Sequence, residues 1–247
     1  AGIVAEVMAL GQNPATLQKA LDKGAADTVT TSMEEAVKDA DIVVSAVPVE
    51  AMESVFTEMA PFLKSDAVVT DVGSTRQTVI AAARKGLGDK FHQYAPAHPI
   101  AGGEMPGVDY ASADLFDEKV VISTPDEGMD PKVVTFIEEA WRKAGARVQA
   151  MSPLQHDLTF ASVSHLPHVL AYALVDMIAR EENAQEKLKM AGAGFRDFTR
   201  IASSSPVMWR DICLSNREAL SHELERYRAS LDTLQKYIDE SDGKALE

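Results

Sequence analysis

The stretch "DIVVSAVPVEAMESVFTEMAPFLKSDAVVTDVGST", residues 41–75, decides the fold class of this chain. It opens with a β-rich run at 41–47, continues through a segment of helical pattern and reaches a second β-rich run at 67–72. A strand, a helix and a second strand in this order are typical of a unit in which the two strands lie parallel. The stretch therefore predicts an α/β domain built on a parallel sheet.

The same alternation continues on both sides of this unit up to about residue 150. We predict four further strands, at 4–10, 93–98, 119–123 and 146–150. The helices between the strands have readable ends. Asn13 is placed to cap a helix whose first turn contains Pro14 and which Gly24 closes, and Ser32 with Glu35 forms a capping box for the next helix.

After residue 150 the strands stop and the pattern is helical. One long apolar segment covers about 153–180, a short helix covers 194–202, and an amphipathic stretch runs from about 207 to 238. The chain is therefore predicted to contain two domains. Residues 1–150 form a Rossmann-like, doubly wound parallel sheet, and residues 151–247 form an all-helical domain.

Composition limits the classes of function. With 46% hydrophobic residues, the 247-residue chain has enough apolar side chains for a packed core, and its net charge of −14 argues against binding nucleic acid or an anionic membrane through bulk electrostatics. Cys213 is the only cysteine, so it has no partner for an intrachain disulfide. No uninterrupted apolar run approaches the roughly 18 residues of a membrane helix, and Ala1 begins no secretory signal. We expect a soluble, cytoplasmic protein.

In doubly wound sheets, ligands bind at the carboxyl ends of the strands. The strand at 41–47 ends at Val47 and Pro48, and the strand at 93–98 ends at His98, which a loop rich in Gly and Pro follows. The strand at 67–72 runs out into Asp71, Gly73 and Ser74. Three strand ends thus bring small residues, a hydroxyl group and an imidazole to one predicted rim.

Four segments, in order along nearly the whole chain, resemble the signatures of the prephenate/arogenate dehydrogenases of tyrosine biosynthesis, also called cyclohexadienyl dehydrogenases. They are "TDVGST" (70–75), "HPIAGGEMPGVDYASADLF" (98–116), "SHLPHVLAYAL" (164–174) and "GFRDFTRIASSSPVMWRDI" (194–212). The resemblance implies NAD- or NADP-dependent oxidative decarboxylation of prephenate to 4-hydroxyphenylpyruvate, of arogenate to tyrosine, or of both. It also implies a homodimer formed through the helical domain, with tyrosine as a feedback ligand.

The cofactor site is only partly visible in the sequence. The chain has no G-x-G-x-x-G loop, so the family's first strand, glycine loop and first helix are expected before Ala1. The run at 4–10 resembles the family's second strand. Where NAD-specific enzymes place an acid, this chain has Gly11, followed by Gln12 and Asn13. The missing acid makes NADP a plausible cofactor beside NAD, although Gly11 is equally well explained as a turn residue before the Asn13 cap.

His98 is the candidate for the group that accepts the substrate hydroxyl proton, because neutral imidazole titrates near pH 7. The resemblance assigns the same role to the matching histidine. The alternative is a histidine that only fixes the following loop. Ser74 is expected to bind the same hydroxyl or His98, and it is also placed to cap the helix that follows.

Arg200 is the candidate that holds a substrate carboxylate, since a guanidinium offers a planar fork of donors and keeps its charge. In an acidic protein an ordinary ion pair is the alternative, and it is the preferred explanation for Arg196. The resemblance adds Trp209 as a residue that reaches the substrate, although packing is its default role, and Gly194 as a point of close backbone approach.

His165 and His168, which are three residues apart, lie on one helix face of an otherwise apolar segment, and Ser164 is adjacent to them. A metal site needs a third protein ligand, and none stands at a suitable spacing, so we expect no metal. Two histidines satisfied within the core are the alternative from residues alone. The resemblance favours a substrate cavity lined by all three side chains. Pro167 is expected to kink this helix.

Two other functions remain open from the sequence. A dehydrogenase acting on β-hydroxyacids would share the two-domain plan, but it would be expected to use a catalytic lysine in the helical domain. A non-catalytic dimerising fragment is the second alternative, because the glycine loop is absent from the sequence. Cofactor binding distinguishes the fragment from an enzyme.

Overall fold

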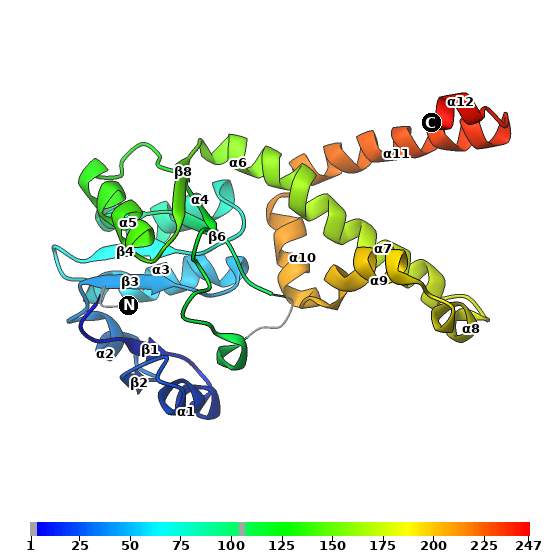
Figure 1. The fold of residues 1–247 in the computed structure, drawn as a ribbon. Helices are drawn as coiled ribbons and strands as arrows, with labels where there is room; N and C mark the ends of the chain where they lie inside the picture. The colour runs from blue at the N-terminus through cyan, green and yellow to red at the C-terminus, as the bar shows by residue number, and fades with distance from the viewer. Residues whose placement is uncertain (1–3, 104–106) are drawn as a thin grey trace. The chain divides into compact units, whose positions relative to one another are not determined.

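The computed structural model describes residues 4–103 and 107–247 (Figure 1). Glu104, Met105 and Pro106, which belong to the predicted signature 98–116, lie outside the described residues. The chain divides into two compact units. The first contains Ala1–His156 and Ser204–Ser215, and the second contains Asp157–Ser203 and Asn216–Glu247.

Among the described residues of the first unit, eight strands form three small sheets. The strands are β1 (Met8–Leu10), β2 (Thr28–Thr30), β3 (Ile42–Ser45), β4 (Val68–Asp71), β5 (Tyr94–Ala95), β6 (Ala97–Ile100), β7 (Val120–Ser123) and β8 (Arg147–Ala150). The sheets have the orders β1-β2, β3-β4-β5 and β6-β7-β8. All pairs are parallel except β6 with β7, which is antiparallel. The predicted parallel sheet is therefore confirmed, with β6 as the exception.

Two predicted strands need correction. The run at 93–98 is not one strand, because Pro96 separates β5 from β6 and a proline has no N–H to donate to a ladder. His98 consequently lies inside β6, opposite Ile122 of β7, and does not end a parallel strand. The run at 4–10 forms a strand only at Met8–Leu10, and β2 was not predicted at all.

The helices of the first unit are α1 (Pro14–Asp22), α2 (Met33–Val37), α3 (Met52–Met59), α4 (Gln77–Leu87), α5 (Pro131–Lys143) and α10 (Pro206–Ser215). Two of them, α1 and α2, begin where the sequence predicts a cap. The Asn13 side chain accepts hydrogen bonds from the N–H groups of Ala15 and Thr16, and Ser32 Oγ accepts one from Glu35. The predicted N-caps at Asn13 and Ser32 are confirmed, because capping is a contact between near neighbours in sequence.

The largest apolar core of this unit lies between α3, α4 and the sheet β3-β4-β5. Phe56, Val69 and Tyr94 are fully buried, and the rings of Phe56 and Tyr94 meet edge to face at 5.6 Å. Gly86 of α4 lets the two helices approach closely, since a Cβ there would lie 2.6 Å from the Cβ of Phe56. Burial of a side chain such as Phe56 stabilises the fold by about 1.5–3 kcal/mol, so this core fixes the strands whose ends form the site.

The second unit is helical, as predicted. Its helices are α6 (Pro153–Phe160, which starts in the first unit), a π-helical turn (Ala161–His165), α7 (Leu166–Ala179), α8 (Ala184–Lys189), α9 (Ala193–Thr199), α11 (Arg217–Asp239) and α12 (Gly243–Leu246). The predicted stretch 207–238 is two helices, because the chain leaves helical geometry at Asn216. The π-helical turn directly precedes Pro167, and Leu166 donates to the carbonyl of Ala161 there. A π-helical turn is a common cause of a bend in a helix.

Among the residues that the structure describes, one helical stretch, Pro153–Ala179, is long and apolar enough to cross a membrane by length and composition alone. Only 22% of its most apolar window is buried within the single chain. The stretch also contains Asp157 and His165, which are both buried in hydrogen bonds with Asn216 of the same unit. Those buried polar contacts are typical of a helix in the core of a water-soluble protein.

Candidate active site

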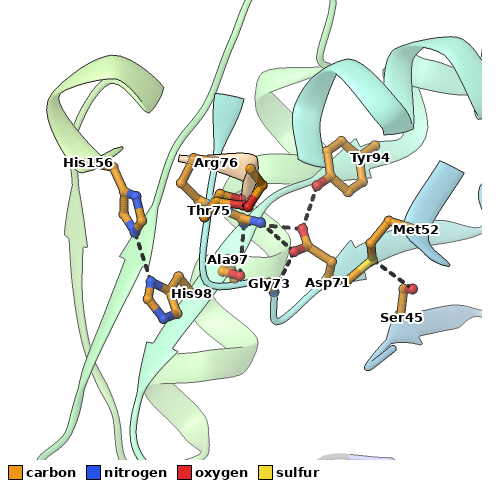
Figure 2. A network of polar contacts seen from close by, with 11 residues as sticks. Ser45, Met52, Asp71, Gly73, Thr75, Arg76, Tyr94, Ala97, His98 and His156 are labelled. Carbon is orange, nitrogen blue, oxygen red and sulfur yellow. Dashed lines mark hydrogen bonds and ion pairs between the residues drawn. The ribbon is translucent and has the colours of Figure 1, made fainter. Parts of the chain in front are cut away.

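The site lies where β4 ends and β6 begins (Figure 2). Asp71 is the last residue of β4, and its fully buried carboxylate binds the guanidinium of Arg76, with 2.6 Å between Oδ1 and Nη2. The same carboxylate accepts hydrogen bonds from the backbone N–H of Gly73, at 2.7 Å, and from the hydroxyl of Tyr94. Asp71, predicted as a cofactor residue at the rim, therefore lies in the interior and holds the loop that leads to Gly73 and Ser74.

Burial and the neighbouring carboxylate raise the pKa of Tyr94 well above its ordinary value, and the positive charge of Arg76 opposes this rise. Tyr94 thus stays a neutral donor at physiological pH. The network contains one cation, one anion and a neutral phenol, so its buried charges are balanced.

Gly73 has no room for a side chain. A Cβ at this position would lie 2.9 Å from both Nη2 of Arg76 and Oδ1 of Asp71. Ser74 follows in the same loop and is half-buried. The expectation that Ser74 caps the next helix is wrong, because α4 begins at Gln77 and its capping position is Arg76.

His98 forms a hydrogen-bonded pair with His156, which sequence analysis did not select. The distance from Nδ1 of His98 to Nε2 of His156 is 2.8 Å, and the ring centroids lie 5.0 Å apart (Figure 2). His156 is fully buried on α6, whereas His98 is partly exposed on β6. One proton lies between the two nitrogens, so one ring donates and the other accepts.

The chemistry of the pair depends on which ring donates. When His98 donates through Nδ1–H, its Nε2 carries a lone pair that can accept a proton from a ligand. When His156 donates, His98 Nε2 is protonated and cannot act as a base. The pair therefore can hold His98 in the tautomer that a proton acceptor needs, which is the role of the orienting group in other catalytic pairs.

Trp209 belongs to the first unit through α10. Its side chain is 7% exposed, and α10 packs on the 3₁₀ turn Val49–Ala51, which directly follows Val47 and Pro48. The C-terminal end of α10 is bound to the start of α4, because Ser215 Oγ donates to Thr75 Oγ1 at 3.1 Å. These contacts bring Trp209 and the ends of β3 and β4 into one region of the unit.

The remaining predicted substrate residues lie in the second unit. His165 is 1% exposed, and its Nδ1 lies 3.1 Å from Nδ2 of Asn216, which also donates to the carbonyl of Asp157 at 2.8 Å. A carbonyl can only accept, so it places the amide nitrogen of Asn216 at this position, and His165 Nδ1 accepts its second hydrogen. His165 therefore carries its proton on Nε2.

Ser164 and His168 are joined through the backbone. Nδ1 of His168 lies 2.9 Å from the carbonyl oxygen of Ser164, so this nitrogen donates and Nε2 keeps the lone pair. Burial lowers the pKa of His168 from its ordinary value of 6.5, and the hydrogen bond to Ser164 opposes the shift. His168 is thus held neutral near pH 7.

Gly194 and Arg200 lie at two ends of the α9 segment. Gly194 is in the first turn of α9, and apart from its chain neighbours and the nearby backbone of its own helix, no atom of the described residues lies within 4 Å of the place where its Cβ would be. The described chain itself therefore imposes no close approach at Gly194. Arg200 starts the 3₁₀ turn Arg200–Ser203 and is exposed.

Besides Asp71 and Gly73 after β4, the predicted cofactor residues lie at the ends of β1 and β3. Asn13 uses its side-chain oxygen to cap α1, at 2.9 Å from the N–H of Ala15, while Gln12 is exposed. A Cβ on Gly11 would lie 3.2 Å from Leu17 of α1, which gives this glycine a packing role. Pro48 is exposed beyond β3.

The residues at these ends are compatible with a nicotinamide dinucleotide. Small, uncharged residues such as Gly11, Pro48 and Gly73 follow the strands, and Asp71, the acid at the end of β4, is paired with Arg76. Within the described residues, no group of three His, Cys, Asp or Glu side chains is arranged to hold a metal ion.

A groove lies elsewhere in the first unit. It has a volume of about 560 Å³ and lies between α4 and the start of α6, where Ile80, Arg84 and Leu154 line it. It contains no histidine and no strand end. We therefore place the site at the His98–His156 pair, where the chemistry of the side chains points.

Fold and site together define the class of the protein: a nicotinamide-dependent dehydrogenase with a Rossmann-like nucleotide-binding domain followed by a helical domain. The family model "Prephenate dehydrogenase, nucleotide-binding domain" matches residues 1–150, and "Prephenate dehydrogenase, dimerization domain" matches residues 152–247. The chain belongs to the prephenate dehydrogenase family.

Individual relatives agree with this assignment. The chain is 39% identical over 230 residues to the cyclohexadienyl dehydrogenase of Zymomonas mobilis and 35% identical over 229 residues to the prephenate dehydrogenase of Bacillus subtilis, covering 92% of this chain in each case. It spans 77% of the first relative and 62% of the second. The crystal structure of Aquifex aeolicus prephenate dehydrogenase with hydroxyphenyl propionate and NAD⁺ superposes with a TM-score of 0.91 at 36% identity, over 99% of this chain and 86% of that one.

Four residues of these networks were missed in the sequence, namely Tyr94, Arg76, His156 and Asn216. Arg76 directly follows the signature 70–75, so its position next to that motif was the available signal. His156 had no such signal, because it lies 58 residues from His98 in the sequence.

Proposed function

We propose that the protein catalyses the oxidative decarboxylation of prephenate, arogenate or both, with His98 as the proton acceptor. One observation carries the proposal: in a chain that matches the family over both domains, the predicted base is held by a buried histidine at 2.8 Å. The bound nicotinamide dinucleotide would supply the acceptor for the hydride that leaves the hydroxyl-bearing ring carbon.

The residues of the chain account for the proton. His98 takes the proton of the substrate hydroxyl on Nε2 while the hydride leaves, and its Nδ1–H stays bonded to His156. The ring carboxylate then departs as carbon dioxide, and the electron pair of the broken C–C bond enters the ring, which becomes aromatic. The phenolate oxygen so formed takes the proton back from His98, so proton and electrons balance.

The other predicted residues orient the substrate. Ser74 donates to or accepts from the substrate hydroxyl, and the guanidinium of Arg200 binds a carboxylate in a bidentate pair. His165 offers an Nε2–H donor and His168 an Nε2 acceptor, as the contacts within the second unit require. One imidazole thus donates and the other accepts. Together they can recognise a side chain that carries a carboxylate group and either a carbonyl or an amine. Trp209 and Gly194 complete the proposed set.

We propose weak discrimination between the two nicotinamide dinucleotides. Neither an acid that would repel a 2′-phosphate nor an arginine that would bind it stands at Gly11, Gln12 or Asn13. A tenfold preference corresponds to about 1.4 kcal/mol, and these uncharged residues give no basis for a larger value. The kcat/KM values for NAD and NADP should therefore lie within about a factor of ten of each other.

We also propose a cytoplasmic homodimer that forms through the helical unit. The apolar helical stretch that the single chain leaves largely uncovered belongs to the segment matched by the dimerization domain. Tyrosine shares a phenol and a carboxylate with the ligand of the Aquifex relative, so tyrosine is expected to compete with the substrate at the same site.

The test is formation of reduced nicotinamide by the purified protein with each pairing of prephenate or arogenate with NAD or NADP. A parallel measurement with His98→Asn should give a kcat lower by roughly 10²–10⁴-fold at unchanged thermal stability, the range for a lost acid–base partner. Full turnover by the His98 variant would remove this residue from the mechanism. No turnover by the unaltered protein, together with no cofactor binding, would favour the dimerising-fragment alternative.

A further inference from the structure

We propose that Arg76 is a positioning residue that sets the spacing between Ser74 and His98. The inference rests on the proposed function for the roles of those two residues. Arg76 is fully buried and touches two elements (Figure 2). Its Nη2 binds Asp71 Oδ1 at 2.6 Å, and its Nη1 donates to the carbonyl oxygen of Ala97 at 3.0 Å.

The contact with Ala97 fixes His98. The carbonyl of Ala97 and the N–H of His98 belong to one planar peptide unit. A donor that holds this carbonyl therefore holds the plane from which the His98 side chain departs. The position of His98 along β6 depends on a guanidinium that comes from the loop after β4.

The contact with Asp71 fixes the other half of the site. The oxygen that binds Nη2 of Arg76 also accepts the N–H of Gly73, at 2.7 Å. Gly73 directly precedes Ser74, and its backbone is packed against the ion pair so closely that a Cβ would not fit. One buried ion pair thus holds the peptides next to both Ser74 and His98.

Only a guanidinium has the shape for this task. Its donors diverge from one plane, so Nη2 reaches the carboxylate while Nη1 reaches the carbonyl and Nε bonds the carbonyl of Thr75 at 3.1 Å. A lysine keeps the charge but places its three donors on one atom. A buried ion pair often adds little stability, since apolar replacements are often as stable. The geometry of the Arg76–Asp71 pair therefore explains its presence better than stability does.

The test compares Arg76→Lys with Tyr94→Phe. Both substitutions remove a partner of the same carboxylate, but only the first one affects the hold on Ala97 and His98. Arg76→Lys is expected to lower kcat by about 10²-fold, the cost of misplacing a catalytic group by about 1 Å, with KM much less affected. Tyr94→Phe is expected to leave kcat close to the unaltered value. Wild-type kcat in R76K, or an equal loss in both variants, would overturn the inference.

A second readout does not depend on turnover. The imidazole ¹⁵N signals of His98 in the ligand-free protein report the surroundings and tautomer of this ring. They should shift in R76K and stay in place in Y94F. If the unaltered protein shows no dehydrogenase activity, the proposed function fails, and these signals still decide about Arg76, because unshifted signals in R76K would refute its positioning role. Should R76K not fold, the charge-neutral D71N/R76Q variant replaces it with the same expectations, since a glutamine is too short to hold both partners.

Discussion

Replacement of His156 by phenylalanine isolates the hydrogen bond to His98. The two rings lie 5.0 Å apart between centroids, and His156 is fully buried, so a phenyl ring keeps most of the packing. What it removes is the nitrogen that lies 2.8 Å from Nδ1 of His98. The substitution therefore changes the partner of the proposed base and leaves the base itself in the protein.

The expected magnitude follows from the loss of one buried acceptor. In the reactive tautomer, His98 carries its proton on Nδ1, and without His156 this N–H has lost the acceptor seen in the structure. A donor left unsatisfied costs about 1–3 kcal/mol. If this cost falls on the reactive tautomer, kcat decreases by about 5- to 150-fold. KM should change little, because His156 does not reach the substrate in the proposed mechanism.

The assay is steady-state formation of reduced nicotinamide by four proteins: unaltered, H156F, H98N and the double variant. Because His156 is proposed to act only through His98, H156F should have no further effect in the H98N background. His156→Gln supplies an amide oxygen as an acceptor and should recover part of the lost rate. Thermal unfolding of each variant shows whether the fold is kept.

Two results would refute the reasoning. Wild-type kcat in a folded H156F protein would show that the hydrogen bond does not prepare His98 for catalysis. Independent, multiplicative losses in the double variant would show that His156 acts by another route. Recovery by glutamine without recovery by other polar residues of similar size would support the role of an acceptor at this position.

Three further outcomes are expected. Arg200→Ala should weaken substrate binding by roughly 1.5–3 kcal/mol, the value of a lost charged hydrogen bond; unchanged affinity in a substrate titration would refute the proposed carboxylate contact. Asn216→Leu should lower the free energy of unfolding in urea by about 1–3 kcal/mol, since it leaves His165 and a backbone carbonyl without this donor, whereas the exposed Asn183→Leu serves as the control with little loss. Burial lowers the pKa of His168 below 6.5, so at this residue the folded state binds fewer protons than the unfolded state. The contribution of neutral His168 to the free energy of unfolding is therefore complete above about pH 6.5 and is lost as the pH falls through the lowered pKa. Urea unfolding of His168→Gln should depend less on pH over that range than unfolding of the unaltered protein, and an identical pH dependence would contradict the shift.

Local patterns in the sequence predicted the parts of the fold that local contacts create. The β-rich runs at 41–47 and 67–72 form β3 and β4, and the caps at Asn13 and Ser32 bond to residues two or three positions away. The direction of β6 was not predictable in this way. It depends on pairing with β7, a strand more than 20 residues later, after Pro96 has ended β5.

The same distinction between local and long-range contacts applies to the candidate site. His98 could be selected from its place beside a glycine-rich loop and from its signature, whereas its partner His156 comes from a helix at the other end of the first unit's sequence. Asp71 was selected from its segment, whereas its ion pair with Arg76 could not be predicted, because that pair is a property of the folded loop. A pattern of residue types shows which groups have useful chemistry, and only the fold shows which groups hold them.

The loop from Asp71 to Arg76 explains why residues without substrate contact can control this site. Arg76 donates to the carbonyl beside His98, and Asp71 accepts from the N–H beside Ser74. Thr75 accepts a hydrogen bond from the hydroxyl of Ser215, which ends the helix that carries Trp209. Two elements from distant parts of the sequence, β6 and α10, are thus attached to six consecutive residues. A substitution inside this loop displaces several candidate groups together, so its effect on kcat should exceed its effect on stability. Substitutions in the apolar core beneath it should show the opposite order, because they weaken the scaffold without changing the spacing that the ion pair sets.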